Sequence, residues 1–324
     1  MATISDVAAL AGVSTATVSR VLNGKSTVDT ELVSRVREAA RALDYRPNTV
    51  ARNLRRRDSS VLSLVISDVE NPFFTAVARG VEDTARAAGY SVLLGNSDED
   101  PDKERAYLEL AGQAQTAGVV LSPTGPGTAL PEGTPPVVAV DRPLPGGRHD
   151  AVLVDTRSAA RLATQHLLDQ GYQRVACLTG PPGVHTAEDR LAGYREALAG
   201  RPELVRRSEF KAAGARQASE LLFGERDRPD AVLVANSAMA IGLLGTLAQQ
   251  GLRIGKDIGV VSFDDVPWAS LVHPALTVVR QPAHEIGRRA AGLLLDRIGS
   301  VRGEAHTVVL AAELVVRGSS TREV

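Results

Sequence analysis

Hydrophobic residues near the start of the chain repeat every three or four positions, which is the spacing of amphipathic helices. The first such set is Ile4, Val7, Ala8 and Ala11. Gly12 follows it, where a helix end commonly needs a positive φ angle. Ser14 is a suitable N-cap for a second helix that runs to about Leu22, and a third helix is expected to begin near Asp29. The pattern predicts an all-α head of three short helices.

From residue 61 onward the pattern changes to short β-rich runs that alternate with helical stretches. The runs are Val61–Ile66, Tyr90–Leu94, Gly118–Leu121, Val137–Val140, Val152–Val154, Arg174–Leu178, Ala231–Val234, Ile258–Ser262 and Leu276–Val279. This alternation is typical of parallel α/β sheets. The runs are too many for one compact half, so we expect two similar lobes, each with a Rossmann-like parallel sheet.

These patterns divide the chain into three parts. Residues 1–46 are expected to form a helix-turn-helix head, residues 47–60 a hinge helix or linker, and residues 61–324 a two-lobed body. The length of 324 residues agrees with this division, because it suits about two domains and a small appendage.

Each lobe of the body is expected to combine two separate stretches of chain. The N-lobe takes about 61–155 plus 282–307, and the C-lobe takes about 156–281 plus 308–324. Ligands of parallel sheets bind outside the carboxyl ends of the strands. Polar residues follow several of the expected strands: Asp68, Asn96, Asp141, Arg142, Asn236, Asp264, Asp265 and Gln281. Two facing lobes would bring such residues to one cleft, although some of them are expected only to cap the next helix.

The second helix of the head displays small side chains and one arginine on its outer face. The residues that share this face are Thr15, Ala16, Ser19 and Arg20. Two helices joined by a glycine-containing turn form a helix-turn-helix that reads the DNA major groove, and Arg20 has the donors for a guanine edge. Ser14, Thr17 and Asn23 are placed to bind phosphates. An ordinary three-helix bundle is the alternative.

Residues 47–57 contain a short helical pattern followed by three arginines. Asn48 is a possible N-cap, and Val50 and Leu54 align at i and i+4. Two turns of helix are marginal in water without a partner, which a second copy of the chain and DNA would supply. Leu54 would then open a base step in the minor groove, with Arg52 near the phosphates. The alternative is a flexible linker that contains one leucine.

The charge of the chain is unevenly distributed. Residues 1–60 hold ten Lys and Arg against six Asp and Glu, a net charge of +4, whereas the whole chain has a net charge of −1. A basic head on an acidic body favours a polyanion partner for the head alone. No apolar run approaches the roughly 18–20 residues of a membrane span, and the N-terminus lacks the features of a signal peptide. We therefore expect a cytoplasmic, nucleoid-associated protein.

Motifs for catalysis are weak or absent in this sequence. The Gly-Pro-Pro-Gly run at 180–183 lacks the Gly-Lys-Ser/Thr of a P-loop, and no Gly-x-Gly-x-x-Gly follows an expected strand. There is no Gly-x-Ser-x-Gly nucleophile motif. The six histidines lack the spacing of metal ligands, and the single cysteine, Cys177, lies in an apolar run. We expect no enzyme activity, no metal and no cofactor.

Several motifs along the chain together resemble one family. In the head they are Thr3-Ile4-Ser5-Asp6-Val7-Ala8, Gly12-Val13-Ser14, Thr17-Val18-Ser19-Arg20-Val21-Leu22-Asn23 and Tyr45-Arg46-Pro47-Asn48. In the body they are Asn71-Pro72-Phe73-Phe74, Asp189-Arg190-Leu191-Ala192-Gly193-Tyr194, Ser262-Phe263-Asp264-Asp265 and Leu276 through Gln281-Pro282. In this order they resemble the LacI/GalR family of bacterial transcriptional regulators, and in particular its ribose-operon-repressor-like members.

The resemblance implies DNA contacts from the head and the hinge, and it favours the minor-groove role of Leu54. The implied DNA-binding residues are Ser14, Thr15, Ala16, Thr17, Ser19, Arg20, Asn23, Asn48, Ala51, Arg52 and Leu54.

The body is similar to periplasmic sugar-binding proteins, especially those that bind ribose. The implied effector-binding residues are Asn71, Phe73, Phe74, Asp141, Arg142, Arg190, Phe210, Asn236, Asp264 and Gln281. Carboxylates, amides and guanidinium groups suit vicinal hydroxyls, and phenylalanine faces cover the C–H surface of a sugar. The chain departs from the family at Ser237 and Ala117, where Asp is usual, and no heptad pattern precedes Val324 to support a coiled-coil tetramer.

Together these observations predict a homodimeric repressor that binds a pseudo-palindromic double-stranded operator and is released by a small sugar, ribose or a related pentose. One alternative is a regulator that needs a co-repressor, such as a nucleobase or nucleoside, or a phosphoprotein partner. Another is a sugar receptor or a sugar-modifying enzyme without a DNA role.

Overall fold

The computed structural model describes residues 2–22, 29–45, 59–224, 227–299 and 303–322. Contacts between residues divide the chain into two units, Met1–Ser59 and Ser60–Val324. The described part of the first unit holds the helices α1 (Ile4–Ala11), α2 (Thr15–Leu22) and α3 (Thr30–Ala42).

The ends of these helices follow from their capping residues. Thr3 and Asp6 form a reciprocal capping box at the start of α1, and Gly12 ends it with a φ angle of 62°. Asp29 accepts a hydrogen bond from the backbone of Glu31 and so caps α3. The helical head and its helix starts are therefore as the sequence predicts.

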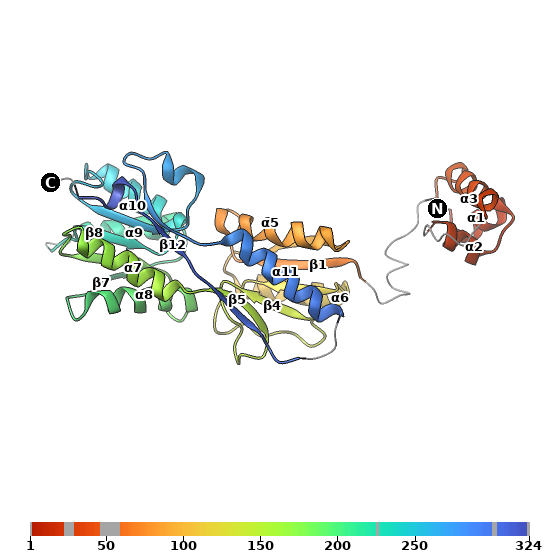
Figure 1. Ribbon diagram of the computed structural model, residues 1–324, viewed down its shortest axis with the longest axis horizontal. Coiled ribbons are helices and arrows are strands. Elements are labelled where there is room, and N and C mark those ends of the chain that lie inside the picture. Colours follow the sequence, from red (N-terminus) through yellow and green to blue (C-terminus); the bar gives the residue numbers. More distant parts are fainter. Residues whose placement is uncertain (1, 23–28, 46–58, 225–226, 300–302, 323–324) are drawn as a thin grey trace. The chain divides into compact units, whose positions relative to one another are not determined.

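The second unit is the two-lobed body, and most of its elements belong to the N-lobe or the C-lobe according to the sheet that they form or cover (Figure 1). The N-lobe comprises β1 (Val61–Ile66), α5 (Pro72–Ala87), β2 (Ser91–Asn96), α6 (Pro101–Gln113), β3 (Gly118–Leu121), β4 (Val137–Val140), β5 (Asp150–Val154), α11 (Ala283–Gly299) and β11 (Thr307–Leu310). The C-lobe comprises α7 (Thr156–Asp169), β6 (Val175–Thr179), α8 (His185–Leu198), β7 (Leu204–Arg207), α9 (Ala212–Gly224), β8 (Ala231–Val234), α10 (Ser237–Gln249), β9 (Gly259–Phe263), η1 (Pro267–Ser270), β10 (Thr277–Arg280), β12 (Glu313–Val315) and η2 (Gly318–Ser320).

Each lobe is built on one six-stranded sheet. The strand order is β11-β5-β4-β3-β1-β2 in the N-lobe and β12-β10-β9-β8-β6-β7 in the C-lobe. The expected parallel sheets are confirmed, and neighbouring strands run parallel except at β12, which pairs antiparallel with β10. This exception arises because β12 enters the C-lobe directly from β11, without a helix that would reverse the chain.

Helices cover both faces of each sheet, since alternate strand residues point to opposite sides. In β1, Leu62 and Leu64 pack into the cluster that holds side chains of α5 and α11. Val65, on the opposite face, packs with Leu108 of α6. The C-lobe sheet has α7 and α8 on one face and α9 and α10 on the other.

The chain crosses between the lobes three times. The crossings lie between β5 and α7, between β10 and α11, and between β11 and β12. The last crossing falls between Leu310 and Glu313, a few residues beyond the expected boundary at about 307–308, because β11 pairs with β5 in the N-lobe sheet. Both lobes are therefore discontinuous in sequence.

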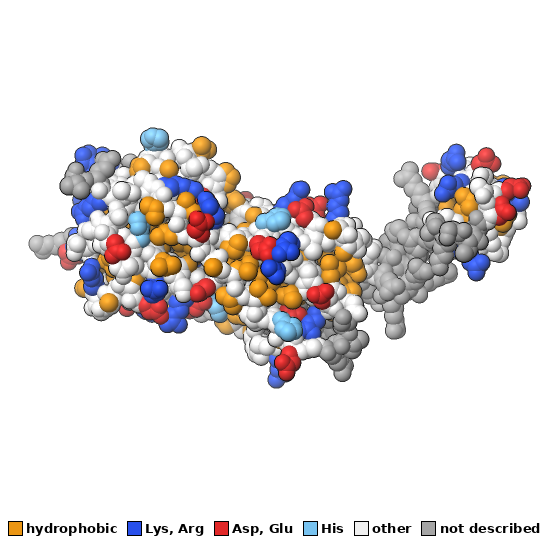
Figure 2. All heavy atoms as spheres, in the orientation of Figure 1, with side chains coloured by type: hydrophobic (Ala, Val, Ile, Leu, Met, Phe, Trp, Pro, Cys, Tyr) orange, Lys and Arg blue, Asp and Glu red, His pale blue; other side chains and the backbone are white. Residues whose placement is uncertain are grey.

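The surface of the body carries charges of both signs. Figure 2 shows blue and red side chains interspersed on one face, including the face of α5 and α11. Many are neutralised locally, as where Glu285 binds Arg288 and Arg289 along α11. A mixed surface of this kind suits solubility better than it suits a polyanion.

Candidate functional site

The outer face of α2 is the candidate DNA-reading surface of the head. Thr15, Ala16 and Arg20 are exposed, while Thr17 and Ser19 are half-buried. The buried residues Val18 and Val21 face the core of the head. The sequence therefore predicted the orientation of α2 correctly, and the longest side chain on its exposed face is that of Arg20.

The turn before α2 is held by two contacts. Ser14 accepts a hydrogen bond from the backbone N–H of Thr17 at 3.1 Å, which makes it the expected N-cap. Arg35 donates to the carbonyl of Ala11 at 2.6 Å, and a Cβ atom at Gly12 would meet its guanidinium at 2.8 Å. The remaining expected DNA-binding residues, Asn23, Asn48, Ala51, Arg52 and Leu54, lie outside the described residues.

The candidate effector site is a cavity between the two lobes. All ten residues expected to bind the effector line it: Asn71, Phe73, Phe74, Asp141, Arg142, Arg190, Phe210, Asn236, Asp264 and Gln281. The structure thus brings together residues that are up to 210 positions apart in the sequence.

Strand ends and helix starts position these residues. Asn71 caps α5 by accepting from the backbone of Phe73 at 3.0 Å, and Asn236 caps α10 in the same way. Asp141 follows β4 and Asp264 follows β9, both with positive φ angles, of 64° and 75°. Such backbone strain in non-glycine residues is concentrated at binding sites, where it aims a side chain at a ligand.

Arg190 is the buried cation of the C-lobe wall. Its side chain is only 5% exposed, its Nη1 donates to the carbonyl of Ala235 at 2.6 Å, and its guanidinium lies 4.3 Å from the ring centre of Phe263. Burial lowers the pKa of Arg190, and the charges of Asp141 and Asp264 oppose that shift. The guanidinium remains a charged donor held in place by its surroundings.

Asp264 is the acceptor opposite this cation. Its carboxylate accepts from Gln281 Nε2 at 2.7 Å and from the backbone N–H of Ser237 at 3.2 Å. Burial raises the pKa of Asp264, and Arg190 and Gln281 partly oppose the rise. Ser237, where the family usually has Asp, thus presents a hydroxyl to this carboxylate.

Three buried polar atoms of the lining residues make no hydrogen bond: Arg142 Nε, Arg190 Nε and Gln281 Oε1. Arg142 Nε does lie 3.3 Å from Asp141 Oδ2 in an ion pair. Buried polar groups in native proteins nearly always have a partner, so each such atom needs an explanation. Two donors and one acceptor around a single cavity are explained by a polar ligand or by water.

The cavity also has lining residues that were not selected from the sequence: Asp68, Glu99, Thr186 and Lys211. Asp68 was recognised only as a polar residue after a strand. The one available signal for Lys211 was its place directly after Phe210, which the resemblance implicates, whereas Glu99 is adjacent to no implicated residue. Of the other polar residues at strand ends, Asn96 accepts from the backbone of Val69, and Asp265 binds Arg280, so both are structural.

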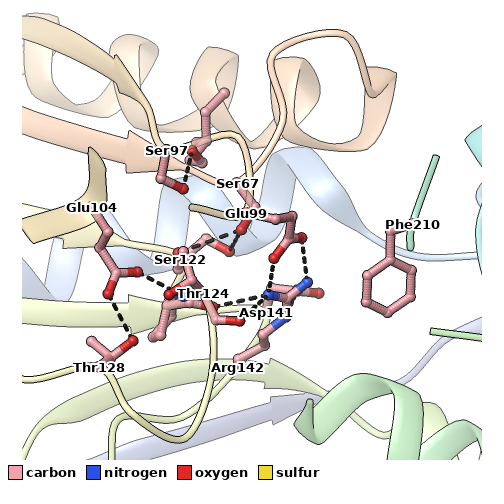
Figure 3. A network of polar contacts seen from close by, with 12 residues as sticks. Ser67, Ser97, Glu99, Glu104, Ser122, Thr124, Thr128, Asp141, Arg142 and Phe210 are labelled. Carbon is pink, nitrogen blue, oxygen red and sulfur yellow. Dashed lines mark hydrogen bonds and ion pairs between the residues drawn. The ribbon is translucent and has the colours of Figure 1, made fainter. Parts of the chain in front are cut away.

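Contacts that involve lining residues of the cavity join the two lobes. Lys211 of the C-lobe donates a hydrogen bond to Asp98 of the N-lobe at 2.6 Å. The hydrogen bond from Lys211 lowers the pKa of Asp98, and Lys103 adds to the effect. Deeper in the cavity, the guanidinium carbon of Arg142 lies 5.4 Å from the ring centre of Phe210 (Figure 3). The lobes are therefore in contact around the site.

Among the described residues there is no group of three or more His, Cys, Asp or Glu side chains that could hold a metal ion. Cys177 is fully enclosed in the C-lobe sheet, and burial raises the pKa of its thiol to about 12, so the thiolate that a metal needs is disfavoured. Within the same described ranges, no helix has the length and apolar character needed to cross a membrane.

Comparison with known proteins matches both parts of the chain. Residues 3–48 match the family described as bacterial regulatory proteins, lacI family, and residues 164–320 match a periplasmic binding protein-like domain. The ribose operon repressor of Halalkalibacterium halodurans is 37% identical over 320 residues, which cover 98% of this chain and 96% of that protein. The chain belongs to the LacI family of bacterial regulatory proteins. This LacI family member is thus a DNA-binding transcriptional regulator and not an enzyme.

Solved structures agree with this assignment. The lac repressor dimer bound to operator and the anti-inducer ONPF has a TM-score of 0.86 and 27% identity, and it covers 99% of both chains. A LacI family transcriptional regulator from Enterococcus faecium with bound ribose has a TM-score of 0.72 and 26% identity, covering 80% of this chain and 98% of that one. With the lac repressor, the chain shares both the helix-turn-helix head and the two-lobed, periplasmic-binding-protein-like body.

Proposed function

We propose that this LacI family member is a homodimeric repressor, acting in the cytoplasm at the nucleoid, that ribose or a related pentose releases from a pseudo-palindromic operator. The observation that carries the sugar assignment is the set of buried polar atoms without a hydrogen bond at Arg142, Arg190 and Gln281, three residues that line one cavity. A polyol supplies both the acceptors and the donor that these atoms need.

The charges of the cavity favour a neutral polyol over an anion. Its lining includes the carboxylates of Asp68, Glu99, Asp141 and Asp264 and the cations of Arg142, Arg190 and Lys211. Since the carboxylates outnumber the cations, a phosphorylated sugar is repelled on balance, whereas hydroxyl groups donate to the carboxylates and accept from the guanidinium groups. Phe73, Phe74 and Phe210 suit the apolar face of a pentose.

A second copy of the chain is the proposed partner of two exposed apolar surfaces. In the N-lobe, the edge strand β2 exposes Leu93 and Leu94, next to a groove lined by Val69 and residues of α5. In the C-lobe, Leu221 of α9 and Ile241 of α10 are 67% and 51% exposed. An unpaired sheet edge with adjacent leucines favours association, and a two-fold dimer would cover both surfaces at once.

Sugar binding is proposed to act on DNA through the hinge at residues 47–60, which lies outside the described residues apart from its last two positions. A short hinge helix is marginal alone, so a coupling free energy of a few kcal/mol is enough to favour its melting. Ligand that closes the cleft and rotates the N-lobes of a dimer would separate the paired hinge helices and weaken DNA binding.

Calorimetric titration of the full chain with D-ribose tests the sugar assignment. We expect saturable binding of ribose, weaker binding of other pentoses and no heat with hexoses. Absence of ribose binding would refute the effector and leave the DNA-binding role intact. If ribose binds but DNA affinity measured by fluorescence anisotropy stays the same at saturation, the proposed release mechanism is wrong.

Arg20→Ala is expected to weaken binding to an operator selected from random duplex DNA. Loss of a bidentate contact to a guanine costs about 1–3 kcal/mol, which is roughly 5- to 150-fold in affinity. Discrimination at one base pair of each half-site should relax as well. Arg41→Ala, at the exposed end of α3, is the control and should have a small effect. Unchanged operator affinity in Arg20→Ala would remove Arg20 from the reading surface.

A further inference from the structure

Glu104 is a buried carboxylate in the first turn of α6. It is only 2% exposed, although it lies outside the set of residues that line the cavity. Burial raises the pKa of Glu104, and hydrogen bonds from Thr128 and Thr124 only partly oppose this shift. Burying an acidic group is costly, so a site that retains one uses its hydrogen bonds for something that an apolar residue cannot supply.

Both carboxylate oxygens of Glu104 bind the loop between β3 and β4. Oε2 accepts from the backbone N–H of Thr124 at 2.6 Å, and Oε1 accepts from Thr128 Oγ1 at 2.7 Å. Such short, charge-assisted hydrogen bonds are about twice as strong as neutral ones. They fix the orientation of the backbone around Thr124.

The other side of that same loop holds Arg142. The carbonyl oxygens of Pro123 and Thr124 accept from Arg142 Nη1 at 3.0 and 3.1 Å. Figure 3 shows Glu104 and Arg142 on opposite sides of Thr124, with Phe210 beyond the guanidinium. One peptide segment therefore connects a buried acid to a cation of the effector cavity.

Glu99 is the second restraint on this guanidinium. It forms a bidentate ion pair with Arg142, at 2.7 Å for each nitrogen, and its own side chain is 23% exposed. Both terminal nitrogens of Arg142 are thus occupied, and its Nε makes no hydrogen bond but lies 3.3 Å from Asp141 Oδ2 in an ion pair. The orientation of the guanidinium therefore depends on Glu99, Asp141 and the two loop carbonyls.

We infer that Glu104 is a positioning residue of the effector site, which holds the β3–β4 loop so that its carbonyls keep the Arg142 guanidinium in place in the cavity lining. The inference rests on the proposed function, because it assumes that the cavity binds a sugar. Without the carboxylate, Thr124 N–H loses its acceptor, the loop carbonyls turn, and the guanidinium is held only by its ion pairs with Glu99 and Asp141. Loss of one oriented donor corresponds to roughly tenfold weaker binding of the ligand.

The test uses the full chain with Glu104→Leu, Glu104→Gln and Thr128→Val. The control is Thr116→Val, because Thr116 is an equally buried N-lobe threonine whose hydroxyl bonds Ala111 and Ser63 and not this loop. Two quantities are measured: amide hydrogen exchange of segments 119–128 and 139–144 without ligand, and the affinity for D-ribose by calorimetry.

We expect Glu104→Leu and Thr128→Val to accelerate amide hydrogen exchange in both segments. Glu104→Leu should weaken ribose binding about tenfold, and Thr128→Val should weaken it severalfold. Glu104→Gln keeps an acceptor for Thr124 N–H and should stay within about threefold of wild type. Thr116→Val should match wild type in both measurements. Rescue by glutamine distinguishes positioning from a mere filling of space.

The inference is overturned if Glu104→Leu and Thr128→Val bind ribose as tightly as wild type, or if Thr116→Val weakens binding as much as Thr128→Val. Failure of wild type to bind ribose refutes the proposed effector instead. The exchange measurement then decides the inference by itself: unchanged exchange in segment 139–144 overturns it, and accelerated exchange there in both Glu104→Leu and Thr128→Val supports it.

Discussion

Replacement of Arg190 by methionine is expected to abolish the response to ribose while leaving operator affinity unchanged. Methionine keeps much of the volume but removes the α8 guanidinium whose charge acts on Asp264. Loss of a hydrogen bond from a charged donor costs about 1.5–3 kcal/mol of binding free energy. That cost corresponds to roughly 10- to 150-fold weaker binding.

Two properties of the site enlarge this effect. Arg190 Nε is one of the buried atoms without a hydrogen bond among the lining residues, so the variant lacks a donor that the proposed ligand would use. The carboxyl of Asp264 also loses the charge that opposes its desolvation, so its pKa rises further and it becomes a poorer acceptor for hydroxyl groups.

Calorimetry with ribose and anisotropy with operator DNA check this prediction side by side. Arg195→Met is the matched control, since Arg195 lies on the same helix but is half-exposed and pairs with Glu203. It should bind both partners normally. Ribose affinity close to wild type in Arg190→Met, or an equal loss of operator affinity, would contradict the assigned role.

The second large effect is expected from Gly287→Ala in α11, which should lower the free energy of unfolding by about 3 kcal/mol. A Cβ atom at Gly287 would lie 2.0 Å from the carbonyl oxygen of Val77, and one at Gly80 would lie 2.0 Å from that of His284. These reciprocal glycines let α5 and α11 touch backbone to backbone. The blocking atoms belong to helix backbones, so no side-chain rotation relieves the clash.

Chemical denaturation measures this change, and Gly292→Ala provides a control of opposite sign. Gly292 lies in the same helix, but a Cβ atom there has no neighbour within 4 Å. Because alanine favours helix over glycine, Gly292→Ala should stabilise the protein by about 0.5–1 kcal/mol. A Gly287→Ala variant as stable as wild type would show that the two helices separate at little cost.

Periodicity predicted the interior strands of the fold well, since they are continuous apolar runs bounded by turn residues. The runs expected at 61–66, 118–121, 137–140 and 231–234 are strands with those same bounds. The strands that were missed are β7, β11 and β12, all half-buried or partly exposed edge strands. Their polar and apolar residues alternate weakly, and only pairing with a neighbour makes them strands.

Some residues of the candidate site could likewise not be predicted from the sequence. The ten effector residues followed from the resemblance, whereas Glu99 and Lys211 depend on conformation that no local pattern encodes. Glu99 adopts a φ angle of 59° to reach Arg142, and Lys211 meets Asp98 only because the lobes approach each other. The sequence pattern did not identify Glu104 as a buried residue near the site, because an acidic residue in the first turn of a helix ordinarily faces solvent.

The threefold crossing between lobes has a consequence for how the protein is made. The N-lobe begins at residue 61, but its sheet is complete only when β11 reaches Leu310. At about 5–20 residues per second, the ribosome needs roughly 8–30 s to pass from Val154 to Leu310. Until α11 has been translated, the sheet face that later packs against its residues Ile286, Ala290 and Leu294 lacks this cover. The first lobe to leave the ribosome therefore matures after most of the second has been translated, and a chain stalled in between presents the apolar surface that chaperones recognise.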